Sequence, residues 1–189
     1  MQNNNVISDE ELYQLMCTSH KKDLAFKALY NRYKTRVYGY CRKVVGDVYA
    51  EDAFQETFVR FYTSAHSDRN VTNVIGFLMT IARNLCLNIK ERNEKHVVEF
   101  KDLSELDIPF VEDDAISDEH LKQAIHKALD VLADEYREAV YLQIYSGLSY
   151  EEIAKVIGKP VSTVRNRIVR AKTKMRDLLS GYFKEHHKE

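Results

Sequence analysis

The sequence predicts an all-α protein built from two small helical domains. Only six Gly and two Pro occur among 189 residues, which leaves few candidates for β-turns. Apolar residues instead recur at three- and four-residue steps over long stretches, the period of amphipathic helices. One acidic stretch interrupts this period. The expected organisation is therefore a first domain over residues 1–95, an acidic flexible linker over 96–117 and a second domain over 118–189.

Four helices are expected in the first domain, over Asp9–Cys17, Asp23–Val45, Tyr49–Thr63 and Ile75–Arg92. Asp47 stands where it can cap the third. The helix over Asp23–Val45 has a continuous apolar stripe on one side and basic residues on the opposite side. The basic side either contacts single-stranded nucleic acid or is simply solvated, and the pattern favours solvation.

The third helix carries an unusual outward face. Opposite its buried stripe, the helical period places one exposed aliphatic residue among acidic and amide side chains: Asp52, Gln55, Glu56 and Val59. A surface of this kind suits a protein partner with basic residues better than it suits DNA.

Residues 65–74 contain turn-forming residues without periodicity, which predicts a loop. The helix that follows has a largely polar outward side, formed by Thr80, Arg83, Asn84, Leu87 and Glu91, with Phe77 and Asn88 at its border.

The net charge of -1 conceals an uneven distribution along the chain. Residues 1–96 hold 14 Lys and Arg against 11 Asp and Glu, residues 97–119 hold 1 against 9, and residues 120–189 hold 13 against 9. Two basic blocks therefore flank an acidic segment, which keeps nucleic-acid binding open. The apolar residues within the acidic segment leave two alternatives, a plain spacer or a segment that docks in a groove of a partner.

The second domain is expected to contain helices over Leu121–Leu132 and Glu135–Tyr145, followed by a helix-turn-helix over residues 148–172. Ser149 and Glu152 have the spacing of a capping box, which starts a helix at Ser149. Gly158 and Pro160 end that helix in a three-residue turn and allow the next one to begin.

The last helix divides into an apolar side and a polar side. Val164, Ile168, Ala171, Met175 and Leu178 are expected to face the core. Small polar and basic residues and one aliphatic residue occupy the opposite arc and its flanks, as base reading in the major groove requires: Ser162, Thr163, Arg165, Asn166, Val169, Arg170 and Thr173. A merely solvated amphipathic helix is the alternative. It is disfavoured because cap, turn and polar arc agree in register.

Several function classes find no support in the sequence. Cys17, Cys41 and Cys86 are widely spaced and odd in number, which indicates reduced thiols, and the His residues lack ligand spacing, so no metal or cofactor is expected. No phosphate loop or nucleophile motif occurs, which argues against an enzyme and a small-molecule substrate. The polar start is no signal peptide and no run of about 18 apolar residues exists, so we expect a cytoplasmic protein without membrane insertion.

Three segments resemble the sigma factors of bacterial RNA polymerase, specifically the two-domain extracytoplasmic-function type. AEDAFQETFVRFY is similar to the segment that contacts the polymerase clamp, and FLMTIARNLCLNIKER to the helix that handles the minus-ten element. DEYREAVYLQIYSGLSYEEIAKVIGKPVSTVRNRIVRAK resembles the fourth region, which reads the minus-thirty-five element. The resemblance covers residues 8–180. It implies an alternative sigma factor that directs promoter-specific transcription initiation.

The resemblance also implies partners and residue roles. The partners are core RNA polymerase, promoter DNA as duplex and as melted non-template strand, and an anti-sigma factor as antagonist. Asp52, Gln55, Glu56 and Val59 would contact the clamp, and Asn166, Val169 and Arg170 the minus-thirty-five bases. The loop Ser67–Asn73 would receive a flipped base. The full minus-ten set comprises Ser67, Asp68, Arg69, Asn70, Phe77, Thr80, Arg83, Asn84 and Asn88.

The sequence departs from the family pattern at two aromatic positions, where Tyr62 and Phe77 stand in place of a frequent Trp. The competing interpretation is a stand-alone helix-turn-helix regulator with a sensor or dimerisation domain in its N-terminal half. The acidic outward face of the third helix argues against it, because such a domain has no reason to carry that face.

Overall fold

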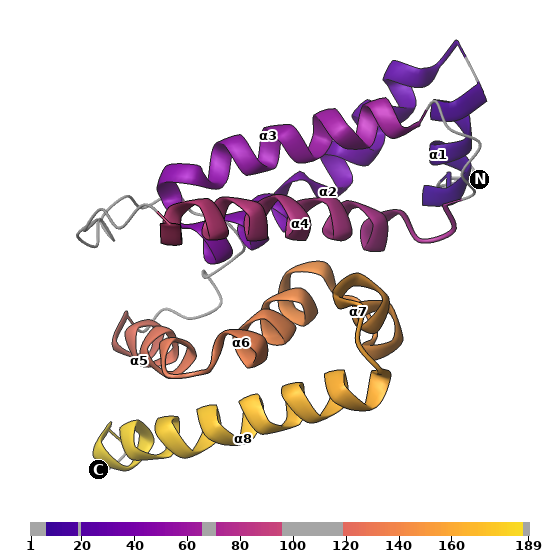
Figure 1. The fold of residues 1–189 in the computed structure, drawn as a ribbon. Coiled ribbons are helices and arrows are strands. Elements are labelled where there is room, and N and C mark those ends of the chain that lie inside the picture. Colours follow the sequence, from indigo (N-terminus) through magenta and orange to yellow (C-terminus); the bar gives the residue numbers. More distant parts are fainter. Residues whose placement is uncertain (1–6, 19, 66–70, 96–118, 187–189) are drawn as a thin grey trace, which may run out of the picture. The chain divides into compact units, whose positions relative to one another are not determined.

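The computed structural model describes residues 7–18, 20–65, 71–95 and 119–186. Within these ranges the regular structure is entirely helical, which confirms the predicted fold class (Figure 1). The chain divides into two compact units between Leu106 and Asp107, a point outside the described residues. The first unit contains helices α1 (Asp9–Thr18), α2 (Lys22–Val45), α3 (Asp47–Ser64) and α4 (Val74–Lys95).

The first unit is a helical bundle in which α2, α3 and α4 pack against one another and α1 packs against α2 (Figure 1). Its largest fully buried side chains include Tyr13, Leu29, Tyr40, Phe61 and Leu78. An aromatic ladder lines the junction of α2 and α3, with neighbouring ring centroids 4.8–6.2 Å apart. The rings form tilted and edge-to-face pairs, the arrangements that the quadrupole of an aromatic ring favours. The ladder consists of Phe26, Tyr30, Tyr38, Phe54, Phe58 and Tyr62.

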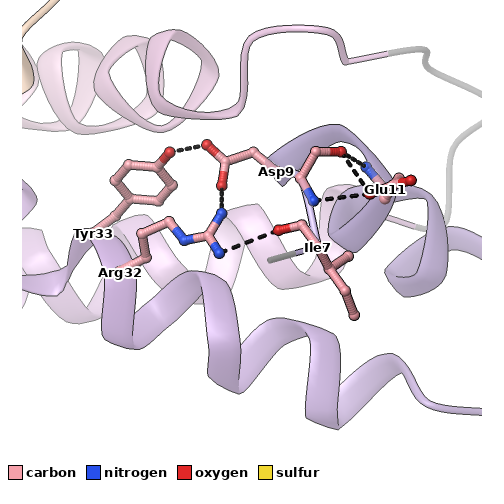
Figure 2. Close-up of polar contacts among 6 residues, drawn as sticks. Ile7, Asp9, Glu11, Arg32 and Tyr33 are labelled. Atoms are coloured by element: carbon pink, nitrogen blue, oxygen red, sulfur yellow. Dashed lines mark hydrogen bonds and ion pairs between the residues drawn. The ribbon is translucent and has the colours of Figure 1, made fainter. Parts of the chain in front are cut away.

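Polar contacts fix α1 on α2, as Figure 2 shows. The Asp9 carboxylate accepts hydrogen bonds from the Arg32 guanidinium and the Tyr33 hydroxyl. Burial, together with that bond to Asp9, raises the pKa of Tyr33. At the start of α1, the Ser8 N–H donates to Glu11 Oε2 at 2.8 Å and the Glu11 N–H donates to Ser8 Oγ at 3.2 Å, a capping box that lowers the pKa of Glu11. The start of α1 is thus held through both backbone and side-chain groups.

The second unit contains α5 (Glu119–Asp130), α6 (Asp134–Tyr141), a π-helix (Leu142–Ser146), α7 (Tyr150–Ile157) and α8 (Val161–His186). Helices α5, α6 and α7 all pack along α8 (Figure 1). The predicted capping box at the start of α7 is confirmed, with the Ser149 N–H donating to Glu152 Oε2 at 2.7 Å and the Glu152 N–H donating to Ser149 Oγ at 3.3 Å. Gly158 has a φ of 64°, and the predicted three-residue turn separates α7 from α8.

Two expectations about local structure are wrong, and the helix expected over Glu135–Tyr145 is confirmed with a change of helix type in its last turn. Gly46, not Asp47, precedes α3 as its cap; its φ of 74° lets the chain end α2 and start α3 within one residue, while Asp47 pairs with Arg42. Leu178 is 44% exposed, because the core contacts of α8 weaken towards its end. The helix expected over Glu135–Tyr145 is α-helical only to Tyr141 and continues as the π-helix, whose Ser146 hydroxyl donates to the Leu142 carbonyl.

Replacing Ser149 by Ala is expected to destabilise the second unit by about 1 kcal/mol, because the Glu152 N–H loses its acceptor at the start of α7. Urea unfolding followed by circular dichroism measures this change. Ser162→Ala is the matched control, since Ser162 is exposed in the first turn of α8 and should shift stability by less than about 0.5 kcal/mol. Equal stability of Ser149→Ala and Ser162→Ala would contradict the capping role.

Candidate functional site

The outward side of α3 forms the first candidate surface, here called the α3 acidic face and defined by Asp52, Gln55, Glu56 and Val59. Asp52, Gln55 and Val59 are exposed, as the helical period predicted, and Glu56 is half-buried. Within the helix, Gln55 donates to Glu51 at 3.0 Å and Glu56 pairs with Arg60 at 2.7 Å. In the part of the chain that the structure describes, the Asp52 carboxylate has no intramolecular partner, so its full charge is available to another molecule.

Val48 extends the α3 acidic face, and the sequence interpretation missed it. Val48 is 64% exposed and Val59 is 55% exposed. The two residues are 11 positions apart, about three helical turns, so both side chains point in nearly the same direction. A helix that begins at Tyr49, as the sequence predicted, leaves Val48 outside it. A helix that begins at Asp47 includes an aliphatic residue at each end of the acidic surface.

Packing on the opposite side of α3 sets the direction of the acidic face. Thr57, Phe58 and Phe61 are buried against the neighbouring helices, and the Thr57 hydroxyl donates to the Ala53 carbonyl at 2.6 Å. At the end of the helix, the Tyr62 hydroxyl donates to Asp23 at 2.7 Å, which raises the pKa of Tyr62. The α3 acidic face is therefore held on a rigid element.

The Tyr62 ring has two further neighbours on α2. The Lys22 ammonium lies 4.0 Å from the ring centroid, and Phe26 packs edge-to-face at 5.1 Å. Tyr62 thus joins the end of α3 to the start of α2.

The outward side of α4 forms the second candidate surface. Thr80, Asn84 and Asn88 follow at four-residue steps; Asn84 and Asn88 are exposed, while the half-buried Thr80 donates its hydroxyl to the Gly76 carbonyl at 2.8 Å. Arg83 is half-buried. Phe77 is half-buried with its ring centroid 6.2 Å from Tyr13 and 6.1 Å from Phe61, so this ring contributes to the core of the unit.

The start of α4 is organised by a side-chain cap. Asn73 Oδ1 accepts the Gly76 N–H at 2.8 Å, and Val74 is buried. A Cβ at position 76 would lie 2.9 Å from Asn73 Nδ2. The absence of a side chain at Gly76 therefore leaves space for the Asn73 side chain to fold back onto the start of α4. The last residue of the predicted base-receiving loop is thus fixed, whereas Ser67, Asp68, Arg69 and Asn70 lie outside the described residues.

The third candidate surface is the polar side of α8, here called the reading face and defined by Ser162, Thr163, Arg165, Asn166, Val169, Arg170 and Thr173. Val164, Ile168 and Ala171 are fully buried, and Met175 is half-buried, as the helical wheel predicted. All members of the reading face are exposed except the half-buried Thr163. Their side chains form no hydrogen bond or ion pair with the rest of the described chain.

Two basic residues of α8 stand apart from the reading face. The Arg167 guanidinium donates to the Glu135 carboxylate of α6 at 2.6 Å, and the Lys174 ammonium donates to the Val131 carbonyl at 2.9 Å. Neither residue belongs to the set that the helical period assigns to the reading face. Both contacts connect residues more than 30 positions apart, and the pattern of a single helix does not reveal them.

The cysteines are free thiols, as expected. Cys41 of α2 and Cys86 of α4 are both fully buried, and the neighbouring Cys86 thiol together with burial raises the pKa of Cys41. Among the described residues, no three His, Cys, Asp or Glu side chains gather where a metal ion could be held. The helices in the described ranges include none long and apolar enough to cross a membrane.

Comparison with known families gives two matches on this chain. The model of Sigma-70 region 2 matches residues 29–96, which comprise most of α2 and all of α3 and α4. The model of Sigma-70 region 4 matches residues 122–175, which contain the helix-turn-helix. Each of the two units therefore contains one sigma-factor region.

Similar proteins agree with these matches. The ECF RNA polymerase sigma-E factor of Haemophilus influenzae is 30% identical, with 88% of this chain and 92% of that protein covered. The RNA polymerase sigma factor CarQ of Myxococcus xanthus is 33% identical, with coverage of 82% and 89%.

Among solved structures, the sigma factor RpoE of Bartonella quintana, in complex with the anti-sigma factor NepR, has a TM-score of 0.68 at 25% identity, with coverage of 82% of this chain and 96% of that one. CnrH in complex with the cytosolic domain of CnrY shares the fold, with a TM-score of 0.67 at 22% identity and coverage of 92% and 97%. Together with the sequence relatives, these findings show that the chain belongs to the ECF sigma factors and is an alternative sigma factor that directs transcription initiation by RNA polymerase.

Proposed function

We propose that the three surfaces divide the work of promoter-specific initiation among them. The α3 acidic face binds core RNA polymerase, the polar side of α4 together with residues 67–70 binds the melted minus-ten element, and the reading face of α8 binds the duplex minus-thirty-five element. The observation that supports this division best is the open reading face: Asn166 and Arg170 lie one turn apart, exposed, opposite the buried Val164 and Ile168.

The chemistry of each surface suits a different target. In the major groove, Arg and Asn side chains form paired hydrogen bonds with base edges. The exposed Val169 can make an apolar contact with the methyl group of a thymine. Melting DNA costs a few kcal/mol per unstacked step, and capture of extruded bases offsets that cost. The amides of Asn84 and Asn88 can both donate to and accept from such bases.

The same proposal implies a compartment for the protein. A factor that acts on core polymerase and chromosomal promoters works in the cytoplasm, and its role is to bind and position DNA rather than to catalyse a reaction. The solved complex of the Bartonella quintana sigma factor with an anti-sigma factor supports an antagonist of that kind for this chain. The division into residues 1–95, 96–117 and 118–189 remains our proposal for the domain boundaries, with the acidic linker outside the described residues.

Replacing Asn84 by Ala is expected to lower transcription by about threefold to tenfold, because one amide contact to a base is lost. The reduction should persist on templates that are already mismatched at the minus-ten element, since the contact is to an exposed base. Multi-round transcription with reconstituted holoenzyme measures both templates. Asn31→Ala on the exposed side of α2 is the control and should leave transcription unchanged. A reduction confined to fully duplex templates would instead assign Asn84 to the melting step.

A further inference from the structure

One flank of α8 is bonded to the body of the second unit at two points. Arg167 donates to Glu135 at 2.6 Å, and its side chain is only 14% exposed although it belongs to the recognition helix. Lys174 donates to the Val131 carbonyl at 2.9 Å. The two basic residues are seven positions apart, about two helical turns, so they lie on the same side of α8.

The groups that accept these bonds are themselves held in place. Glu135 lies in the first turn of α6, and Val131 lies in the connection between α5 and α6. Arg137 donates from Nη2 to the Asp130 carbonyl at 3.1 Å and to the Leu132 carbonyl at 2.8 Å, which ties that connection to α6. The long helix is therefore bonded to a braced segment rather than to a loose loop.

We propose that Arg167 and Lys174 are positioning residues that set the rotation of α8 about its own axis, and with it the direction of the reading face. The proposal deepens the function proposed for α8 and rests on it. Buried side chains hold α8 against the core, but apolar packing is non-directional, whereas a charge-assisted hydrogen bond has a fixed length and direction. Two such bonds on one flank resist rotation in a way that packing alone does not.

Small rotations of α8 would disturb base contacts. The side-chain ends lie about 6 Å from the helix axis, so a rotation of about 20° would move them by about 2 Å. A displacement of that size exceeds what a hydrogen bond to a base edge tolerates. Loss of the Arg167–Glu135 bond should therefore reduce discrimination between base sequences, although neither residue belongs to the reading face.

A role of Arg167 in phosphate binding predicts a different outcome. Replacement of Glu135 distinguishes that role from the positioning role. If Arg167 bound a phosphate, removal of the Glu135 charge would leave DNA affinity unchanged or increase it, because an acidic group would be lost near the DNA. If Arg167 positions the helix, Glu135→Ala and Arg167→Ala should have the same effect. The double variant should then add little to either single change, because both remove one interaction.

The test uses holoenzyme reconstituted from core polymerase and each full-length variant, bound to promoters with a randomised minus-thirty-five element. Glu135→Ala and Arg167→Ala are each expected to reduce the preference for the best sequences by about fivefold, within the range of one good base contact, without changing the dependence of affinity on salt. The charge exchange Glu135→Arg with Arg167→Glu should restore part of the preference. Lys172→Ala, an exposed residue on the other flank, is the control and should leave the preference profile intact.

The stability of each variant is measured by thermal unfolding. If one of the single variants does not fold, the charge exchange still tests the proposal. The proposal is overturned if Arg167→Ala weakens all sequences equally and lowers the salt slope by about one while Glu135→Ala has no effect. Wild-type holoenzyme that binds the promoter but shows no minus-thirty-five preference would contradict the function proposed for α8 itself. Preserved preference in wild type with unchanged profiles in both single variants would contradict only the positioning role.

Discussion

Replacing both Asp52 and Glu56 by Lys is expected to weaken binding to core RNA polymerase by at least about thirtyfold, which corresponds to about 2 kcal/mol. Asp52 is exposed without an intramolecular partner in the described chain, and Glu56 is bonded only to its neighbour Arg60 on the same helix. Reversal of two charges on the α3 acidic face places like charges against a basic partner. The fold should survive, because the buried side of α3 is unchanged.

Binding is measured by titrating core polymerase against labelled full-length protein, at two salt concentrations because surface charge interactions are screened. The matched control replaces Glu10 and Glu151 by Lys, which changes the net charge equally at two exposed positions outside the α3 acidic face. Val48→Asp tests the aliphatic end of the surface and should also weaken binding. Undiminished affinity of the Asp52 and Glu56 double variant would show that core polymerase binds elsewhere.

Replacing Arg170 by Ala is expected to change which minus-thirty-five sequence the protein prefers, with a loss of about tenfold for its best site. Arg170 and Asn166 lie one turn apart at the centre of the reading face, so both can enter the groove together. Removal of a base contact relaxes specificity at one position, whereas removal of a phosphate contact weakens all sequences alike.

Selection from a randomised minus-thirty-five element measures these preferences. Asn166→Ala should relax a position next to the one affected by Arg170→Ala. Arg176→Ala, exposed beyond the reading face on the same helix, is the control and should leave the profile unchanged. Unchanged profiles for both Asn166→Ala and Arg170→Ala would mean that α8 docks on DNA through another side.

Local signals account for the parts of the fold that the sequence predicts well. The capping box of Ser149 and Glu152, the turn at Gly158 and the apolar stripe through Val164 and Ile168 each depend on residues within one or two turns of each other. The reading face follows directly, because a helix with one buried side must expose the other. The α3 acidic face is predictable for the same reason, apart from Val48.

Contacts between distant residues account for what the sequence does not reveal. The bonds of Arg167 to Glu135 and of Tyr62 to Asp23 join different helices, and that of Lys174 to Val131 joins α8 to the connection between α5 and α6. Helical periodicity contains no information about partners on another element. The π-helix is equally hidden, because the segment Leu142–Ser146 has the composition of an ordinary amphipathic helix. These unpredicted contacts are the ones that orient the predicted surfaces.

The most direct test of the central claim is transcription in a reconstituted system from a library of DNA fragments of the organism that encodes the chain. Core polymerase with the wild-type protein should initiate at a defined set of start sites that share two upstream elements, whereas core polymerase alone should not. The Asp52 and Glu56 double variant should abolish that set, and Arg170→Ala should redistribute initiation among its members. Identical transcript patterns with and without the protein would contradict the account.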